Sequence, residues 1–362
     1  MTEKPLRARL DDVARRAGVS LSTASRVINN NGYPVAESTR ERVLEAVRAL
    51  NYSPSVLARA LVTKRTQIVG VIVGDVEDPY FAEIVRGVED VARRAGYLVI
   101  VCNADRDPAT ELSYLRTLLD YRVDGVILAG GGVLDEAFQQ SHVQAVARLE
   151  HQGSVVVALA EVAAEVPRIS IDNRGAAAAM ARHLIGLGHR RIGVIAGPER
   201  ITTAQSRLQG IRDVLGEGGL PPELIANGDF TVSGGERAAE ALCARSPMPT
   251  ALLAVNDQMA IGALTAAHRR GLNVPGDLTI VGFGDTTAAR QAWPPLTTIS
   301  VPRHEMGASA MRGLLEQLQG GEPVASSTLE WSLVVRGSCG PPAPIDQSSA
   351  SRMRWATTCR PA

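Results

Sequence analysis

Short apolar runs alternate with amphipathic helical patterns through most of this 362-residue chain. The first series of runs is Ile68–Val73, Leu98–Cys102, Val126–Leu128 and Val155–Leu159. The second series is Ile169–Ile171, Ile192–Ala196, Ala251–Ala254 and Leu278–Phe283. Strands that alternate with helices predict parallel sheets covered by helices on both faces. Because about 270 residues of this kind exceed a usual single core, we expect two α/β lobes.

The N-terminal segment carries a different pattern, that of a helix–turn–helix. Apolar residues at helical spacing predict a first short helix: Leu10, Val13, Ala14 and Ala17. Gly18 suits the bend, and Ser20 is a good N-cap for a second helix. The polar face of that second helix carries groups that pair with base edges and phosphates: Ser22, Ser25, Arg26 and Asn29. A small helical packing unit with a solvated polar face is the alternative.

A third helix is expected next, with Ser38 and Glu41 as a capping box at its start. The charge distribution supports a nucleic-acid module in this part of the chain. The whole chain is neutral, with 38 basic and 38 acidic side chains, but residues 1–66 hold 12 Lys and Arg against 6 Asp and Glu. A basic head on an acidic body fits a DNA-binding module attached to something else.

The stretch NYSPSVLARALVTKRT predicts a helix of about two turns that begins near Pro54. A helix that short is marginal in water, so we expect it to form only against a partner. Its apolar residues would pair with a symmetry mate or offer a wedge to a minor groove. An ordinary interdomain linker explains the local sequence equally well.

Long segments of the chain match one protein family. In the head they are DVARRAGVSLSTASRVIN and NGYPVAESTRERVLEAVRALNYSPSVLARAL. In the body they are IVGVIVGDVEDPYFAEIVRGVE, RVDGVILAG, SIDNRGAA, HLIGLGHRRIGVIAGP, AVNDQMAIGAL, NVPGDLTIVGFGD and PPLTTISVP. Over roughly residues 9 to 337 the chain resembles the lactose repressor/galactose repressor (LacI/GalR) family. The resemblance implies a DNA-binding regulator whose body has the periplasmic-binding-protein architecture, with an effector between two lobes joined by three crossing segments.

The resemblance also implies a domain plan. A helix–turn–helix domain would cover residues 1–52, a hinge helix and linker 53–66, and an effector-binding and dimerisation body 67–337. In the body, residues 67–167 and 300–328 would form one lobe, and 168–297 with the last strand the other. The composition of residues 338–362 predicts a disordered tail. Because the tail has no apolar heptads, we expect a homodimer rather than a helix-bundle tetramer.

The family positions that contact DNA carry over residue by residue. Leu21, Ser22 and Arg26 match positions that reach base edges, and Thr23 and Ser25 are expected to hold phosphates. Asn29 and Tyr52 are weaker candidates for backbone contacts. Leu61 matches a leucine that relatives insert at the centre of a palindromic site. Two departures lie at helix starts: Arg9 replaces a Thr that commonly caps the first helix, and Ala36 replaces a Ser before the third.

Strand ends supply the effector candidates, because ligands of open α/β sheets bind outside the carboxyl ends of the strands. The candidates are Tyr80, Phe81, Thr203, Arg207, Phe230, Asn256 and Asp285. The two neighbouring aromatic residues would stack on a sugar or base ring, Arg207 would fork onto hydroxyls or a carboxylate, and Asp285 would accept from paired hydroxyls.

Several alternatives stay open for this site. One of the two aromatic residues is open to a core role, Asp257 and Asp285 are each open to a helix-capping role, and Glu161 is a weaker candidate. Gly284 takes a position that is often acidic in the family, so the polar roles are open to a shift of one residue.

Other chemistries find little support. The four cysteines lie far apart and the six histidines show no metal spacing, so neither a zinc site nor a disulfide framework is indicated. Cys102 is expected to be a packed thiol and His189 to make hydrogen bonds within the fold. Glycines 130–132 lack the Lys-Ser/Thr of a P-loop. Since no catalytic constellation is visible, we expect no enzyme activity, cofactor or metal.

Two functions of different classes fit these observations. The first is a transcriptional regulator, expected to be a repressor, in which a homodimer binds a near-palindromic operator and a sugar or nucleobase changes the lobe angle. The second is a solute-binding or sugar-processing α/β protein whose head mediates protein contacts. A solute binder would need an export signal, yet MTEKPLRAR lacks its apolar core and no 18-residue apolar run is present. We therefore expect a cytoplasmic, nucleoid-associated regulator with no membrane partner.

Overall fold

The computed structural model describes residues 8–29, 34–52, 65–218 and 224–343. The chain divides into an N-terminal unit, which ends at Ile68 and takes in Arg122–Asp124, and a larger unit that holds the rest. The predicted hinge helix after Pro54 lies outside the described residues.

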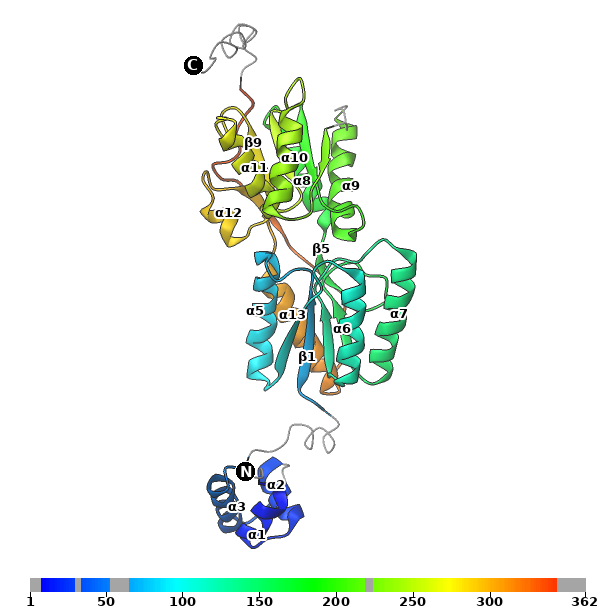
Figure 1. Cartoon of the computed structure of the whole chain (residues 1–362), viewed down its shortest axis with the longest axis vertical. Coiled ribbons are helices and arrows are strands. Elements are labelled where there is room, and N and C mark those ends of the chain that lie inside the picture. Colours follow the sequence, from blue (N-terminus) through cyan, green and yellow to red (C-terminus); the bar gives the residue numbers. More distant parts are fainter. Residues whose placement is uncertain (1–7, 30–33, 53–64, 219–223, 344–362) are drawn as a thin grey trace, which may run out of the picture. The chain divides into compact units, whose positions relative to one another are not determined.

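The head of the N-terminal unit is the predicted helix–turn–helix with a third helix, shown in blue in Figure 1: α1 (Leu10–Ala17), α2 (Leu21–Asn29) and α3 (Glu37–Ala49). One buried cluster holds them together: Val13, Ala14, Ala17, Ala24, Val27, Val43 and Ala46. Gly18 has φ 63°, a left-handed conformation that lets the chain turn sharply after α1. Val19 packs on the same cluster, so the predicted bend is confirmed.

The helix starts differ from expectation in two places. Arg9 provides no side-chain cap for α1, but the Asp12 carboxylate accepts a hydrogen bond from Arg9 N at 2.9 Å and satisfies that donor. The predicted capping box of Ser38 and Glu41 is wrong. Helix α3 already begins at Glu37 after Ala36, whose side chain cannot accept a hydrogen bond, so Ser38 lies inside the helix.

The first lobe of the larger unit is a four-stranded parallel sheet in the order β2-β1-β3-β4. Its strands are β1 (Ile68–Val73), β2 (Leu98–Asn103), β3 (Gly125–Leu128) and β4 (Val155–Ala158). Its helices are α5 (Pro79–Arg94), α6 (Pro108–Asp120), α7 (Glu136–His151) and, from much later in the chain, α13 (Arg303–Leu318). A Cβ on Gly70 would meet Leu118 of α6, and one on Gly125 would meet Leu314 of α13. Because β1 and β3 pair in the register Gly70↔Val126, these glycines face opposite sides of the sheet, so helices cover both faces as predicted.

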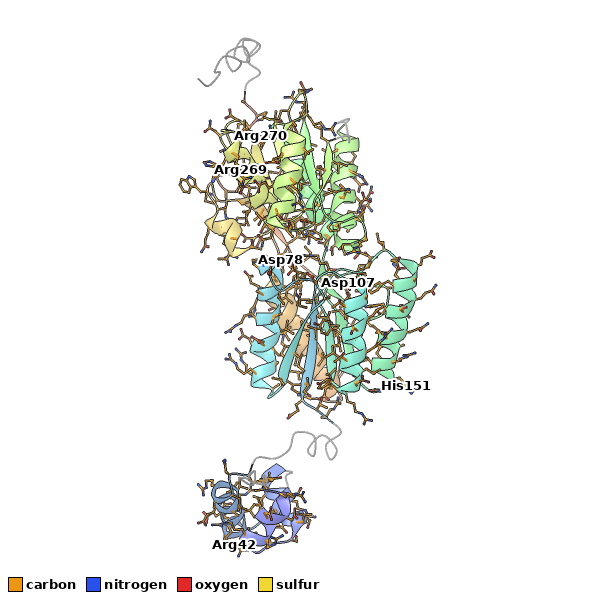
Figure 2. The ribbon with its side chains drawn as sticks, in the orientation of Figure 1. Arg42, Asp78, Asp107, His151, Arg269 and Arg270 are labelled. Carbon is orange, nitrogen blue, oxygen red and sulfur yellow. The ribbon has the colours of Figure 1, made fainter. Side chains whose placement is uncertain are left out.

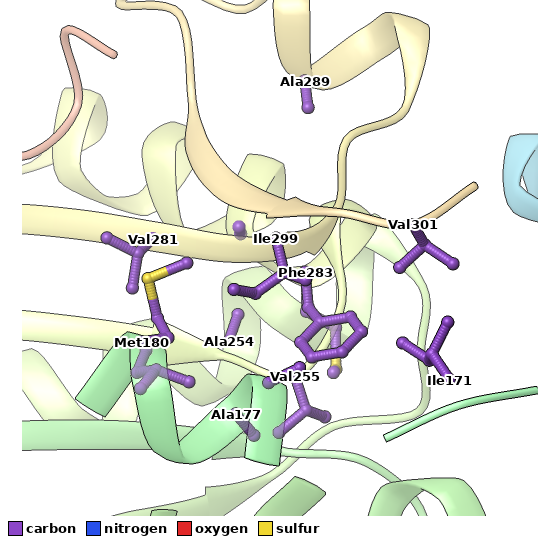
Figure 3. Packing of buried hydrophobic residues seen from close by; sticks show 14 of the residues in the cluster. Ile171, Ala177, Met180, Ala254, Val255, Val281, Phe283, Ala289, Ile299 and Val301 are labelled. Carbon is purple, nitrogen blue, oxygen red and sulfur yellow. The ribbon is translucent and has the colours of Figure 1, made fainter. Parts of the chain in front are cut away.

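The second lobe is a six-stranded sheet in the order β12-β10-β9-β8-β6-β7. Its strands are β6 (Ile192–Ala196), β7 (Ile225–Asn227), β8 (Ala251–Ala254), β9 (Thr279–Gly284), β10 (Thr297–Ser300) and β12 (Ser332–Val334). Its helices are α8 (Asn173–Gly186), α9 (Thr202–Glu217), α10 (Val232–Cys243), α11 (Asp257–Arg269) and α12 (Thr287–Gln291). Figure 3 shows Phe283 of β9 packed beside Val255 and Ile299, and Met180 of α8 against the sheet. The expectation of parallel strands holds except at β12, which runs antiparallel to β10.

Strand β5 (Ile169–Ile171) belongs to neither sheet, contrary to its place in the predicted second series. It pairs with β11 (Ser327–Leu329) in a parallel two-stranded ribbon between the lobes (Figure 1). At each of these two strands the chain passes from the first lobe into the second. Short apolar runs alone do not say which sheet a strand joins.

The C-terminal segment is ordered further than predicted. Residues 338–343 belong to the described structure, and Ser338 and Gly340 are bonded to the second lobe, so a disordered tail from residue 338 is wrong for this part. His189 is fully buried and lies 2.9 Å from both Thr250 Oγ1 and the Gly340 carbonyl. Cys102 is buried, as predicted. Within the described ranges, no helix combines the length and apolar character needed to cross a membrane.

Candidate functional site

Ser20 fixes the start of α2. Its Oγ accepts a hydrogen bond from Thr23 N at 3.1 Å, which confirms the predicted N-cap. The same Oγ lies 2.8 Å from Thr23 Oγ1 and 2.9 Å from Ser22 Oγ. The three hydroxyls therefore form a cluster at the helix N-terminus, where the helix dipole favours a negatively charged partner.

The residues predicted to contact DNA lie on α2. Leu21 is 53 % exposed, Ser22 and Arg26 are exposed, and Thr23 and Ser25 are half-buried. Leu21, Ser22, Ser25 and Arg26 are spaced at one and four residues, so they share one side of the helix. An apolar side chain, hydroxyls and a guanidinium on one open helix face can read base edges and hold phosphates.

The weaker candidates Tyr52 and Asn29, and the predicted wedge Leu61, are described less fully by the structure. Tyr52 packs against the head core, where burial raises the pKa of its hydroxyl. Asn29 ends α2, but its side chain lies outside the described structure, as does Leu61.

A pocket lies between the two lobes of the larger unit, at the carboxyl ends of strands from both sheets. It encloses about 990 Å³ of space not filled by protein atoms, its open mouth included. The first lobe contributes loops after β1 to β4, and the second lobe contributes loops after β6 to β9. Figure 2 shows Asp78, one of the lining residues, at the edge of the first lobe that faces the second. This is the location that the strand-end argument predicts.

Six of the seven predicted effector residues line this pocket: Tyr80, Phe81, Thr203, Arg207, Phe230 and Asn256. Tyr80 and Phe81 meet edge to face with ring centroids 5.4 Å apart. Phe230 closes the opposite side, with Arg106 stacked 5.6 Å above its ring. Three aromatic rings thus surround the space, and each can cover a flat or ring-shaped ligand.

Asp285 is the exception, because it does not line the pocket. Its carboxylate lies 2.6 Å from Arg336 Nη2 and 3.5 Å from Arg290 Nε, so two guanidinium groups hold it elsewhere. The alternative that Asp285 caps α12 is also wrong, since Thr286 takes that role. The predicted pairing of Asp285 with effector hydroxyls is therefore not supported by its position.

Arg207 is the most buried cation of the pocket, at 6 % exposed. Its Nε donates to Asn173 Oδ1 at 2.8 Å, and its Nη1 donates to the Val255 carbonyl at 2.7 Å. The guanidinium stacks 3.8 Å from the centre of the Phe283 ring and hydrogen-bonds with the Tyr80 hydroxyl. Burial lowers the pKa of Arg207, and the Asp257 and Asp78 carboxylates oppose that shift. The hydrogen bond between Arg207 and Tyr80 joins α9 of the second lobe to α5 of the first.

Asp257, the first residue of α11, lines the pocket from the second lobe. Its Oδ1 accepts from Thr298 Oγ1 at 2.6 Å and its Oδ2 from Thr286 N at 2.7 Å. Burial raises the pKa of this carboxyl group, and both hydrogen bonds oppose the shift. Asn256 rather than Asp257 caps α11, with its Oδ1 accepting from Met259 N. The capping role considered for Asp257 is therefore wrong, and its carboxylate faces the pocket region instead.

Three charged residues that line the pocket were not among the predicted effector contacts: Asp78, Arg106 and Glu111. Arg106 Nη1 lies 2.6 Å from Asp75 Oδ2, and its Nη2 lies 3.2 Å from Asp78 Oδ2. Burial raises the pKa of Asp78, which also caps α5. The signal for this pair was present, because charged residues follow both β1 and β2 at adjacent strand ends.

The strand-end pattern does not predict Glu111, because this residue lies in the first turn of α6 rather than directly after a strand. Its Oε1 lies 3.2 Å from Nε2 of His142, which is 1 % exposed on α7. Neither ring nitrogen of His142 makes a hydrogen bond within the described structure, so the contact is poorly aligned. Glu161, the weaker candidate, lines a second, more polar cavity that also includes Ser170 and Thr328 of the ribbon. Within the described ranges, no group of three or more metal-binding side chains comes together.

Comparison with known proteins connects both sites to one family. The model "Bacterial regulatory proteins, lacI family" matches residues 9–55, and the model "Periplasmic binding protein-like domain" matches residues 181–339. The chain is 37 % identical to Catabolite control protein A of Priestia megaterium over 322 residues, which is 88 % of this chain and 95 % of that protein. It is 38 % identical to the HTH-type transcriptional repressor CytR of Escherichia coli K12 over 338 residues, 91 % of this chain and 96 % of that one.

Solved structures agree with these relatives. The Lac repressor dimer bound to operator and the anti-inducer ONPF matches with a TM-score of 0.79 and 31 % identity, over 91 % of this chain and 98 % of that chain. The complex of the transcriptional regulator CelR with cellobiose matches with a TM-score of 0.66 and 32 % identity, over 92 % of this chain and 100 % of that chain. Both the head and the two-lobed body are covered by these matches.

Proposed function

The chain belongs to the lacI family of bacterial regulatory proteins, and we propose that α2 reads its operator while the pocket between the lobes binds its effector. It is a DNA-binding transcriptional regulator controlled by a small molecule. The observation that carries the effector site is the pocket itself, which Arg207 and three aromatic rings line at the carboxyl ends of both sheets. The relatives carry the names of regulators, so we propose no catalytic activity.

We propose that two copies act together, because the Lac repressor structure is a dimer on its operator. Two heads would then bind half-sites of a near-palindrome in adjacent major grooves. The effector would change the angle between the lobes, and by reciprocity DNA would change the affinity for the effector. A sugar or nucleobase fits the aromatic walls, and one relative structure holds cellobiose. A regulator with this partner would work in the cytoplasm at the nucleoid.

The assignment to α2 is tested by selecting binding sites from random duplex DNA with the purified protein at two salt concentrations. We expect enrichment of a near-palindrome and binding that weakens steeply with salt. Arg26→Ala should then weaken binding to the selected site by about tenfold or more, because one base contact is worth about 1–3 kcal/mol. Arg116→Ala, which removes an exposed guanidinium from α6, is the matched control. Equal affinity of the Arg26 and Arg116 variants would contradict the assignment.

A further inference from the structure

We infer that the effector is an uncharged or cationic molecule rich in N–H and O–H donors, not a phosphate ester, and that Glu111 is a carboxylate that recognises it. The inference rests on the proposed function of the pocket and concerns the chemistry that this particular pocket accepts. It is carried by the charges on the wall and by the partners that each charge already has.

The lining residues carry more negative than positive charge. The carboxylates of Asp78, Glu111 and Asp257 face the guanidinium groups of Arg106 and Arg207, and no histidine or lysine is part of the described lining. Asp75 adds a fourth carboxylate directly behind Arg106. An anionic ligand would enter a site where like charge disfavours it.

Both guanidinium groups are already committed to partners in the protein. Arg106 is held between Asp75 and Asp78, so its charge is balanced without a ligand. Arg207 donates to Asn173 and the Val255 carbonyl and meets the Tyr80 hydroxyl, with its flat face against Phe283. A phosphate group binds best to a guanidinium with a free pair of parallel donors. To bind here it would have to displace these contacts and would leave buried acceptors without donors.

Glu111 differs from the other two carboxylates. Asp78 receives donors from Arg106 and Tyr80 N, and Asp257 receives donors from Thr298 and Thr286 N. Within the described structure, the Glu111 carboxylate contacts His142 in the poorly aligned arrangement given above. Its oxygens therefore keep acceptor capacity at the pocket wall, where a half-buried carboxylate that a ligand covers needs donors. A hydroxyl or amino group of the ligand supplies them.

The aromatic walls do not discriminate between two sources of such a ligand. Tyr80, Phe81 and Phe230 can cover either a sugar ring or the flat base of a nucleoside. The shared chemistry is several hydrogen-bond donors on a ring without a negative charge. A sugar and a nucleoside differ in hydrophobicity, so a separation step can distinguish them.

The test uses the full-length protein and a methanol extract of bacterial cells, divided on an anion-exchange resin into a neutral-plus-cationic fraction and an anionic fraction. Thermal unfolding is measured with each fraction, because a ligand that binds the folded state raises the Tm. We expect the neutral-plus-cationic fraction to raise the Tm and the anionic fraction to leave it unchanged. A reversed-phase column then separates sugars, which pass through, from nucleosides, which are retained.

The variant Glu111→Gln keeps the shape of the side chain and removes its charge. We expect this variant to need about tenfold more of the active fraction for the same Tm rise, because hydrogen bonds to charged groups are stronger than neutral ones. Glu89→Gln, an exposed residue of α5, is the matched control and should respond as the parent does. Equal responses of the Glu111 and Glu89 variants would overturn the role of Glu111.

The results distinguish the chemistry of the ligand from the function of the pocket. A Tm rise with the anionic fraction alone would overturn the predicted ligand chemistry and leave the effector pocket intact. No Tm rise with either fraction would contradict the proposed pocket function and this inference together.

Discussion

Ser338 offers a sharp test of how the C-terminal segment stabilises the second lobe. Its hydroxyl is fully buried, donates to the Ile280 carbonyl at 2.6 Å and accepts from Thr297 N at 2.8 Å. Ser338→Ala removes both hydrogen bonds and leaves a buried carbonyl on β9 and a buried N–H on β10 without this partner. Each such loss costs about 1–3 kcal/mol, so we expect the free energy of unfolding to fall by about 2–4 kcal/mol.

Urea unfolding followed by tryptophan fluorescence measures this loss. Trp331 packs against the core of the larger unit and should report its unfolding, whereas Trp293 is 91 % exposed and should change little. The midpoint should move to lower urea with an unchanged slope. Ser113→Ala, on the exposed face of α6, is the matched control and should leave stability within about 0.5 kcal/mol. A loss below about 1 kcal/mol for Ser338→Ala would refute the reasoning that two buried partners depend on this hydroxyl.

Three further predictions follow from contacts described above. Gly87→Ala would place a Cβ 2.0 Å from the His304 carbonyl on α13, so we expect it to destabilise the protein by about 1–3 kcal/mol in urea unfolding, whereas Gly186→Ala, with no atom within 4 Å, should not. Burial lowers the pKa of His189 from 6.5, so just below pH 6.5 the unfolded chain binds a proton that the folded chain does not. As the pH is lowered through this range, the free energy of unfolding should therefore decrease by up to about 1.4 kcal/mol per pH unit. That slope should flatten in His189→Gln but not in His151→Gln, and equal slopes in urea titrations would contradict the assignment. Arg207→Ala should abolish the effector response in a DNA-binding titration while operator affinity stays close to normal, and Arg212→Ala on the same helix should retain the response.

The elements of the fold could be predicted closely from local patterns. The apolar runs gave β1 at its observed bounds and β3, β4 and β9 to within about one residue, because buried parallel strands are continuously apolar. The start of α2 followed from Ser20, whose short side chain can cap only its own helix. Local signals of this kind act over a few residues, and the sequence shows them directly.

The errors concern pairings between residues far apart in the chain. Asp285 was expected in the pocket because it follows a strand, but Arg336, 51 positions later, binds its carboxylate. Strand β5 was assigned to a sheet of the second lobe, but its partner β11 lies 158 residues further along. Glu111 was missed because a helix, rather than a strand end, carries it into the wall. Periodicity and spacing hold no information about such long-range partners.

The late position of α13 has a consequence for synthesis of the protein. This helix covers one face of the β1–β4 sheet and packs so closely against α5 that Gly87 and Gly307 leave no room for a side chain. Every strand of the second lobe except β12 is made before α13 leaves the ribosome. During that interval a growing chain carries the unfinished first lobe with its apolar sheet face uncovered, a state that invites aggregation or a chaperone. The first lobe thus waits for α13 until most of the second lobe has been made, and a chain truncated before Arg303 would lack that helix and leave the first core open.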